Sequence, residues 1–228
     1  MSQATSTNIS ERLREVRERI AAAAERSGRN PDEVTLIAVS KTHPAAAVAE
    51  AMSAGVTDFG ENRVQEGVAK SAEVAANSGN APSTWHLIGH LQTNKVRDAV
   101  GAFAILHSVD SERLLRAISN ACSTPIKVLI EVNVAAEPQK HGIAPAELSG
   151  LLAVAGELPN LDVRGLMTVA PLAHDPESVR PVFRELRELS QRHNLPELSM
   201  GMTNDYEVAI EEGATFVRVG RALFGERS

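Results

Sequence analysis

Cysteine and aromatic residues are scarce in this chain. Among 228 residues, Cys122 is the only cysteine, and one Trp, one Tyr and five Phe make up the aromatic side chains. A single cysteine excludes an intramolecular disulfide framework and any zinc site built from several cysteines. Because hydrophobic residues still make up 43% of the sequence, we expect a sizeable core that is aliphatic and rich in alanine.

Long apolar runs and an excess of basic residues are also missing. No run approaches the ~18 residues of a membrane span, and residues 1–8 lack the basic region and apolar core of a secretory signal. The net charge of −6 argues against non-specific binding of nucleic acid. We therefore expect a cytoplasmic protein with no membrane or nucleic-acid partner, in which residues 1–8 form a disordered tail.

Several familiar site motifs do not occur. No Gly-x-Gly-x-x-Gly follows a predicted strand and no P-loop sequence is present, which argues against dinucleotide and nucleoside triphosphate sites. The seven histidines form neither His-x-His nor His-Glu-x-x-His, so a metal-dependent hydrolase is not indicated and we expect no metal ligands.

What the sequence does contain is a regular alternation of strand and helix patterns. Eight short apolar runs predict strands at residues 34–41, 56–60, 84–88, 104–109, 126–134, 163–169, 198–201 and 215–220. Each is followed by a segment with helical spacing, and an amphipathic helix capped by Asn8 precedes the first strand. Strands alternating with helices eight times predict a parallel sheet closed into a barrel. The fold class is thus α/β, a single (β/α)₈ TIM-type barrel spanning residues 9–228, with an extra N-terminal helix.

The residues that follow the predicted strands should share one face of this barrel, where ligands bind. Lys41 ends the first strand, and the last two strands supply Gly201, Thr203 and Gly220, whose backbone amides and hydroxyl suit a phosphate group. An amine beside a phosphate site fits a phosphorylated carbonyl compound held as a Schiff base. Two simpler interpretations remain open: Lys41 as a solvated lysine at a strand end, and Arg218 as the ion-pair partner of a carboxylate such as Glu61.

Several sequence motifs resemble one known family. They are AVSKT at 38–42, FGEN at 59–62 with VQE at 64–66, WHLIG at 85–89 with LQTNK at 91–95, RGLM at 164–167 and LSMGM at 198–202. Together they resemble the pyridoxal phosphate homeostasis protein family, and the match runs from the first strand to Gly225. The resemblance implies a single barrel similar to the amino-terminal domain of alanine racemases. It also implies that the cofactor is pyridoxal 5′-phosphate (PLP) and that no residue is catalytic.

The resemblance also assigns roles to individual residues. Lys41 is similar to the lysine that forms a Schiff base with PLP, Arg218 to the arginine that faces the pyridine nitrogen, and Asn62 to a neighbour of the ring. The phosphate is expected near Ser199, Thr203, Gly220 and the amide of Arg221. This chain departs from the family at two of these positions, since Arg221 replaces a small hydroxyl residue and Thr203 replaces the more usual serine.

On this basis we expect a monomeric protein of vitamin B6 homeostasis that buffers PLP or delivers it to PLP-requiring apo-enzymes without turnover. A PLP-dependent amino-acid racemase is the alternative. Alanine racemases use a tyrosine base from a second domain, whereas this chain ends soon after its eighth strand and its only tyrosine, Tyr206, lies in a predicted helix. A Schiff-base aldolase is a third possibility, which the absence of a PLP chromophore would favour.

Overall fold

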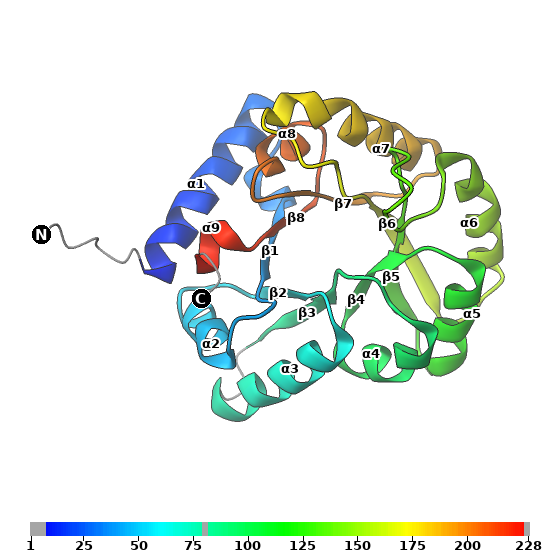
Figure 1. Cartoon of the computed structure of the whole chain (residues 1–228), viewed down its shortest axis with the longest axis horizontal. Coiled ribbons are helices and arrows are strands. Elements are labelled where there is room, and N and C mark those ends of the chain that lie inside the picture. The colour runs from blue at the N-terminus through cyan, green and yellow to red at the C-terminus, as the bar shows by residue number, and fades with distance from the viewer. Residues whose placement is uncertain (1–7, 79–81, 226–228) are drawn as a thin grey trace, which may run out of the picture.

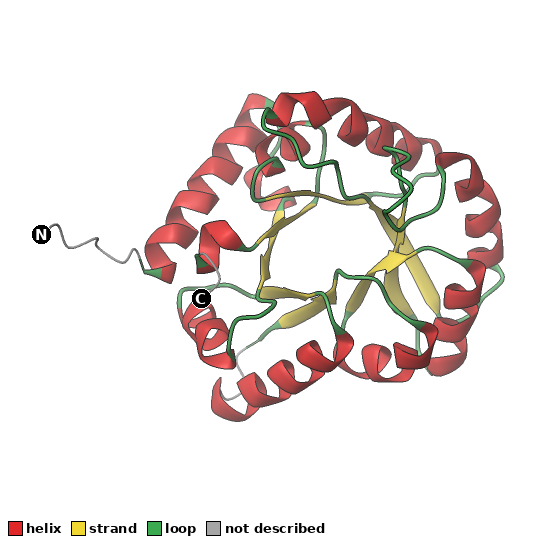
Figure 2. Ribbon diagram, viewed as in Figure 1, coloured by secondary structure: helices red, strands yellow, loops and turns green. Residues whose placement is uncertain are grey.

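Eight parallel strands close into a barrel in the computed structural model, which describes residues 8–78 and 82–225. The strands pair in chain order, and β1 pairs with β8 to close the ring. Figure 2 shows this ring of strands at the centre of the molecule with the helices outside it. The strands are β1 (Thr35–Val39), β2 (Asp58–Glu61), β3 (Thr84–Leu87), β4 (Ile105–Val109), β5 (Ile126–Glu131), β6 (Leu161–Met167), β7 (Glu197–Met202) and β8 (Phe216–Val219).

Helices surround the barrel, and α1 precedes the first strand (Figure 1). The helices are α1 (Ile9–Arg26), α2 (Ala45–Ser53), α3 (Val64–Ser78), α4 (Val96–Ala102), α5 (Glu112–Ala121), α6 (Leu148–Gly156), α7 (Arg180–Arg192), α8 (Tyr206–Glu211) and α9 (Arg221–Phe224). Short 3₁₀ turns lie at Pro31–Glu33, Thr93–Lys95, Pro145–Glu147 and Pro176–Val179. Within the described residues, no helix combines the length and apolar character that crossing a membrane requires. The expected (β/α)₈ barrel with an N-terminal helix is confirmed.

The ends of some elements differ from the prediction. The side chain of Asn8 accepts a hydrogen bond from the amide of Glu11, as the predicted cap requires, while the rest of the expected tail lies outside the described residues. The notable difference is in the helix after β4, which begins only after Ser111, whose hydroxyl accepts a hydrogen bond from the amide of Leu114. The fifth strand ends at Glu131 because the chain then turns away, with only one bridge, Val132 to Ile143, beyond it.

Side chains alternate between the two faces of each strand, so the barrel has an outer and an inner core. The outer core lies between strands and helices and contains most of the buried aliphatic residues. The inner core is a separate small cluster of Ile37, Ile105, Leu129, Met167 and Phe216. On three of these strands the next position on the same face is polar, with His107 two residues after Ile105, Glu131 after Leu129 and Arg218 after Phe216. The polar layer is therefore directed toward the carboxyl ends of the strands.

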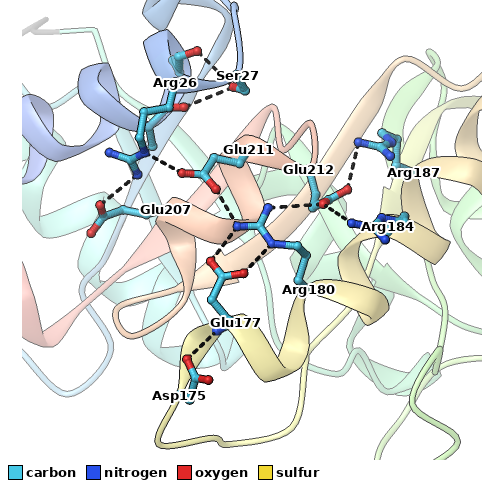
Figure 3. Close-up of polar contacts among 12 residues, drawn as sticks. Arg26, Ser27, Asp175, Glu177, Arg180, Arg184, Arg187, Glu207, Glu211 and Glu212 are labelled. Carbon is cyan, nitrogen blue, oxygen red and sulfur yellow. Dashed lines mark hydrogen bonds and ion pairs between the residues drawn. The ribbon is translucent and has the colours of Figure 1, made fainter.

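An ion-pair network ties the first helix to the last third of the chain (Figure 3). Arg26 of α1 and Arg180 of α7 both contact Glu211 of α8, at 2.7 and 2.6 Å. The neighbouring Glu212, whose side chain is only 5% exposed, faces three arginines of α7. Isolated ion pairs on a protein surface contribute little to folding stability. Because several side chains here share partners in one network, we expect the network to stabilise the fold.

Candidate functional site

A cavity of about 460 Å³ opens at the carboxyl end of the barrel. The family resemblance gives seven residues a role in binding the cofactor. Six of them line this cavity, namely Lys41, Asn62, Thr203, Arg218, Gly220 and Arg221. The cavity spans the junction of β1 and β8, with Lys41 after one strand and Arg218 on the other. Its volume falls in the range of small-molecule sites, ~300–1,000 Å³.

The backbone that carries Lys41 is fixed by hydrogen bonds on both sides, the first of them from the buried ammonium group of Lys70. Lys70 of α3 donates to the carbonyl of Ser40 at 2.7 Å and to Glu61 Oε1 at 2.6 Å. On the other side of Lys41, the amide of Thr42 donates to Glu66 at 2.6 Å, and Thr42 adopts a φ of +67°. A left-handed conformation is unfavourable for a β-branched residue, so these contacts fix a turn that the chain would not otherwise prefer. The alternative pairing of Glu61 with Arg218 does not occur, because Glu61 binds Lys70.

Arg218 is buried beneath the cavity, and its donors are directed by neighbouring strands. Its guanidinium donates to the carbonyl and the hydroxyl of Ser199 on β7, at 3.0 and 2.7 Å, and to the carbonyl of Thr168 at 2.8 Å. Burial lowers the pKa of Arg218 to about 10, against the opposing charges of Glu131 and Asp205. At neutral pH the group remains a cation whose orientation is fixed.

A chain of hydrogen bonds continues from Arg218 through the inside of the barrel. The Ser199 hydroxyl lies 2.9 Å from His107 Nδ1, His107 Nε2 lies 2.9 Å from His86 Nδ1, and His86 Nε2 lies 3.0 Å from Asp58. Arginine can only donate, so the Ser199 oxygen accepts from Arg218 and keeps its own proton available for His107. Burial, with the charges of His86 and Arg218, lowers the pKa of His107 well below its usual range.

Because His107 is neutral, only one of its two ring nitrogens carries a proton. At the far end, His86 donates through Nε2 to the carboxylate of Asp58, which can only accept. Burial opposes ionisation of Asp58, but the bonds from His86 and Thr57 outweigh it and lower the Asp58 pKa. Two histidines thus link the donor Arg218 to the acceptor Asp58.

Two buried acids complete the charge pattern around Arg218. Burial and the nearby Asp110 raise the pKa of Glu131 to about 7, although Arg218 acts in the opposite direction. Burial likewise raises the pKa of Asp205, whose carboxylate accepts from the amide of Met202 at 2.6 Å. Glu131 therefore titrates near neutral pH instead of in the usual acidic range of a carboxyl group.

The remaining site residues lie around the rim of the cavity. Thr203 follows β7, and Gly220 and Arg221 follow β8, with Gly220 packed against the backbone of Val39. The side-chain oxygen of Asn62 is buried and makes no hydrogen bond within the described part of the chain. An acceptor left without a donor at a cavity wall suggests a ligand that supplies one.

The structure and the sequence-based expectations differ at the barrel interior. Ser199 is fully buried and does not line the cavity, since its hydroxyl is engaged by Arg218 and His107. His86 and His107, which fall within two of the predicted strands, lie inside the barrel and contact each other. Lys140, which lines the cavity, was not singled out. The alternation of side chains along a strand could have placed both histidines inward, whereas nothing in the sequence directs the loop that carries Lys140.

Comparisons with known proteins match nearly the whole chain. The protein-family model for the alanine racemase N-terminal domain matches residues 12–228 of this chain. A pyridoxal phosphate homeostasis protein from Aquifex aeolicus is 46% identical over 96% of this chain and 99% of its own length, and one from Pseudomonas aeruginosa is 45% identical over 97% and 96%. The structure of PipY from Synechococcus elongatus with PLP bound is 41% identical, covers 96% of this chain and 100% of PipY, and superposes with a TM-score of 0.79.

Proposed function

Since the chain belongs to the pyridoxal phosphate homeostasis protein family, we propose that it binds PLP reversibly, covalently through the amine of Lys41, and buffers or delivers it inside the cell. The observation that carries this proposal is the placement of Lys41 and Arg218 on neighbouring strands around one cavity. The structure of PipY with PLP bound supports it.

The residues around the cavity fit such a ligand. PLP combines an aromatic ring, a ring nitrogen and a phosphate with an electrophilic aldehyde, which would condense with the amine of Lys41 and release water. Arg218 offers a fixed donor for the ring nitrogen from beneath the cavity, and the buried Asn62 oxygen lacks a donor. Thr203, Gly220 and Arg221 offer a hydroxyl, a close backbone approach and a cationic side chain at the rim. We assign Ser199 to holding Arg218 rather than to the phosphate, because its hydroxyl is already bonded on both sides.

The role of Lys41 is tested by replacing it. Lys41→Ala should remove the visible absorbance of the bound cofactor and the adduct trapped by borohydride, while circular dichroism stays unchanged, because this side chain is outside the core. Lys140 also lines the cavity, so Lys140→Ala is the matched control and should keep the adduct. An adduct that survives in Lys41→Ala, identified by mass spectrometry of the reduced protein, would mean that another amine reacts.

We further propose that bound PLP does not turn over amino acids. Arg218 can only donate toward the acceptor it faces, so the ring nitrogen stays unprotonated and the cofactor is a weaker electron sink. The holo-protein should therefore exchange the α-proton of L-alanine in deuterated water negligibly and form no D-alanine. Rapid exchange that is lost in Lys41→Ala would favour the alternative function, a racemase, which the match to the alanine racemase N-terminal domain raises.

Finally, we propose that the protein acts in the cytoplasm as a monomer and transfers PLP to PLP-requiring apo-enzymes. Mixing the holo-protein with such an apo-enzyme should activate the apo-enzyme by direct transfer. This activation should be faster than that by an equal amount of PLP that has first dissociated from the diluted holo-protein. Sedimentation of the untagged chain tests the monomer.

A further inference from the structure

Three potential metal ligands from separate loops converge at the mouth of the barrel, and none of them lines the cavity. His90 follows β3, Asp110 follows β4, and His141 lies in the loop after β5. The Nδ1 atom of His90 is 3.5 Å from Asp110, and the rings of His90 and His141 stack with centroids 4.0 Å apart and 10° between their planes. One ligand atom from each residue lies within 4.8 Å of the other two.

The loops that carry His90 and Asp110 are joined to each other. Ser108, two residues before Asp110, donates its hydroxyl proton to the carbonyl of Gly89 at 2.5 Å. Gly89 in turn packs so closely on the backbone of Asn62 that an added Cβ would overlap it. The position of His90 beside Asp110 is therefore fixed by backbone contacts as well as by the side chains.

The loop that carries His141 is anchored on both sides. Before it, Lys140 donates to the carbonyl of Val169 at 3.1 Å. After it, Gly142 adopts a φ of +104° and the amide of Ile143 donates to the carbonyl of Glu131 at 2.9 Å. These anchors hold the His141 ring over His90 although the ring itself is exposed.

Two imidazoles and one carboxylate form a ligand set with a clear preference. Zinc sites of three protein ligands, two of them histidine and one a carboxylate, keep a position open for water, and imidazole favours zinc, copper and nickel over magnesium or calcium. Partial exposure leaves an entry path, and the exposed rings of His90 and His141 would rotate out of their stacked arrangement to direct their nitrogens at one ion. We propose that His90, Asp110 and His141 bind a divalent transition-metal ion of the Zn²⁺ type. Sequence spacing cannot reveal such a site because its ligands come from three different loops.

An ion bound here would connect three loops beside the cofactor cavity. Ile88 and Lys140 line that cavity and lie two residues and one residue from the proposed ligands. Metal binding would thus fix one wall of the cavity, although the site itself does not depend on the function proposed for that cavity.

Titration of the untagged, chelator-treated protein with ZnCl₂ and with CoCl₂ tests the proposal. We expect one ion per chain by calorimetry and, with Co²⁺, visible d–d bands. His90→Ala and His141→Ala should each weaken binding at least about tenfold, and acidification should weaken it because the imidazoles must be neutral. The control His174→Ala replaces an exposed histidine outside the cluster and should leave the affinity unchanged. Lys41→Ala should also bind normally, which separates this site from chelation by PLP.

A second measurement needs no variant. In the wild-type chain, Zn²⁺ should shift the ring NMR signals of His90 and His141 and leave those of His174 in place. Absence of stoichiometric binding, equal affinity in the two histidine variants and the wild type, or loss of binding in Lys41→Ala would each overturn the proposal.

Discussion

Arg218 places a positive charge in the middle of the barrel, where the residue is only 4% exposed. Within the described residues its hydrogen bonds go to Ser199 and to a carbonyl, not to a carboxylate. Charge compensation comes from acids farther away, Glu131 and Asp205. A buried charge without a direct counter-ion is costly, which is consistent with a group kept for a ligand.

The pKa of Glu131, raised by burial to about 7, predicts a pH dependence of stability. The unfolded side chain titrates near 4.5, so between these pH values the folded state holds a proton that the unfolded state has lost. The stabilising effect is complete below about pH 4.5 and disappears as pH rises through 7, by up to about 3 kcal/mol. Glu131→Gln should remove this fall, as urea unfolding from pH 5 to pH 8 would measure.

Comparison of wild type with Glu131→Gln at each pH isolates this residue from others that titrate in the same range, such as His107. The experiment is done with a chelator present, since Asp110 contributes to the Glu131 shift. Parallel pH profiles for the two proteins would mean that Glu131 is ionised in the folded state.

Thr203 offers the only side-chain hydroxyl among the six site residues that line the cavity. Thr203→Ala should weaken PLP binding by roughly 1 to 2 kcal/mol, the scale of a hydrogen bond to a charged group. Thr203→Ser keeps the hydroxyl and is the control, with affinity close to that of the wild type. Equal affinities for all three proteins in an absorbance titration would remove this hydroxyl from the phosphate site.

At the scale of elements, the order and type of all eight strands could be predicted because apolar runs and helical spacing are local properties of the sequence. The ends of elements could not, since they depend on contacts between distant segments. Thus β6 begins at Leu161 because it pairs with Ile126. The bond between Ser199 and Arg218 likewise requires the register of β7 with β8, which no local pattern supplies.

Substitution of Gly201 in β7 tests how closely this strand packs against α8. Its φ is +89°, and an added Cβ would lie 2.6 Å from the Ala209 side chain and 2.8 Å from Tyr206 Cα. Gly201→Ala should therefore destabilise the fold by about 2–4 kcal/mol. A Cβ added to Gly101 in α4 would meet no atom within 4 Å, so Gly101→Ala should stabilise by about 0.5–1 kcal/mol. Urea unfolding distinguishes the two, and similar midpoints would contradict the packing at Gly201.

At the scale of the molecule, the first strand is joined to the last. Thr35 pairs with Phe216 and Ala38 with Val219 along the β1–β8 junction. The helices strengthen the same closure, because α1 packs on α8 and α9 and the ion-pair network links α1 to α7 through α8 (Figure 3). Pairing of segments so far apart in sequence carries a high entropic cost before it is formed.

The cavity proposed for PLP spans the β1–β8 junction, with Lys41 contributed by the beginning of the chain and Arg218 by its end. A refolding intermediate in which these strands are unpaired would hold one of the two groups but not both in place. PLP added during refolding would then be captured only by molecules whose barrel has closed. The rate at which cofactor absorbance appears would therefore report the rate of barrel closure. The gain of helical structure, measured by circular dichroism, would be a separate signal.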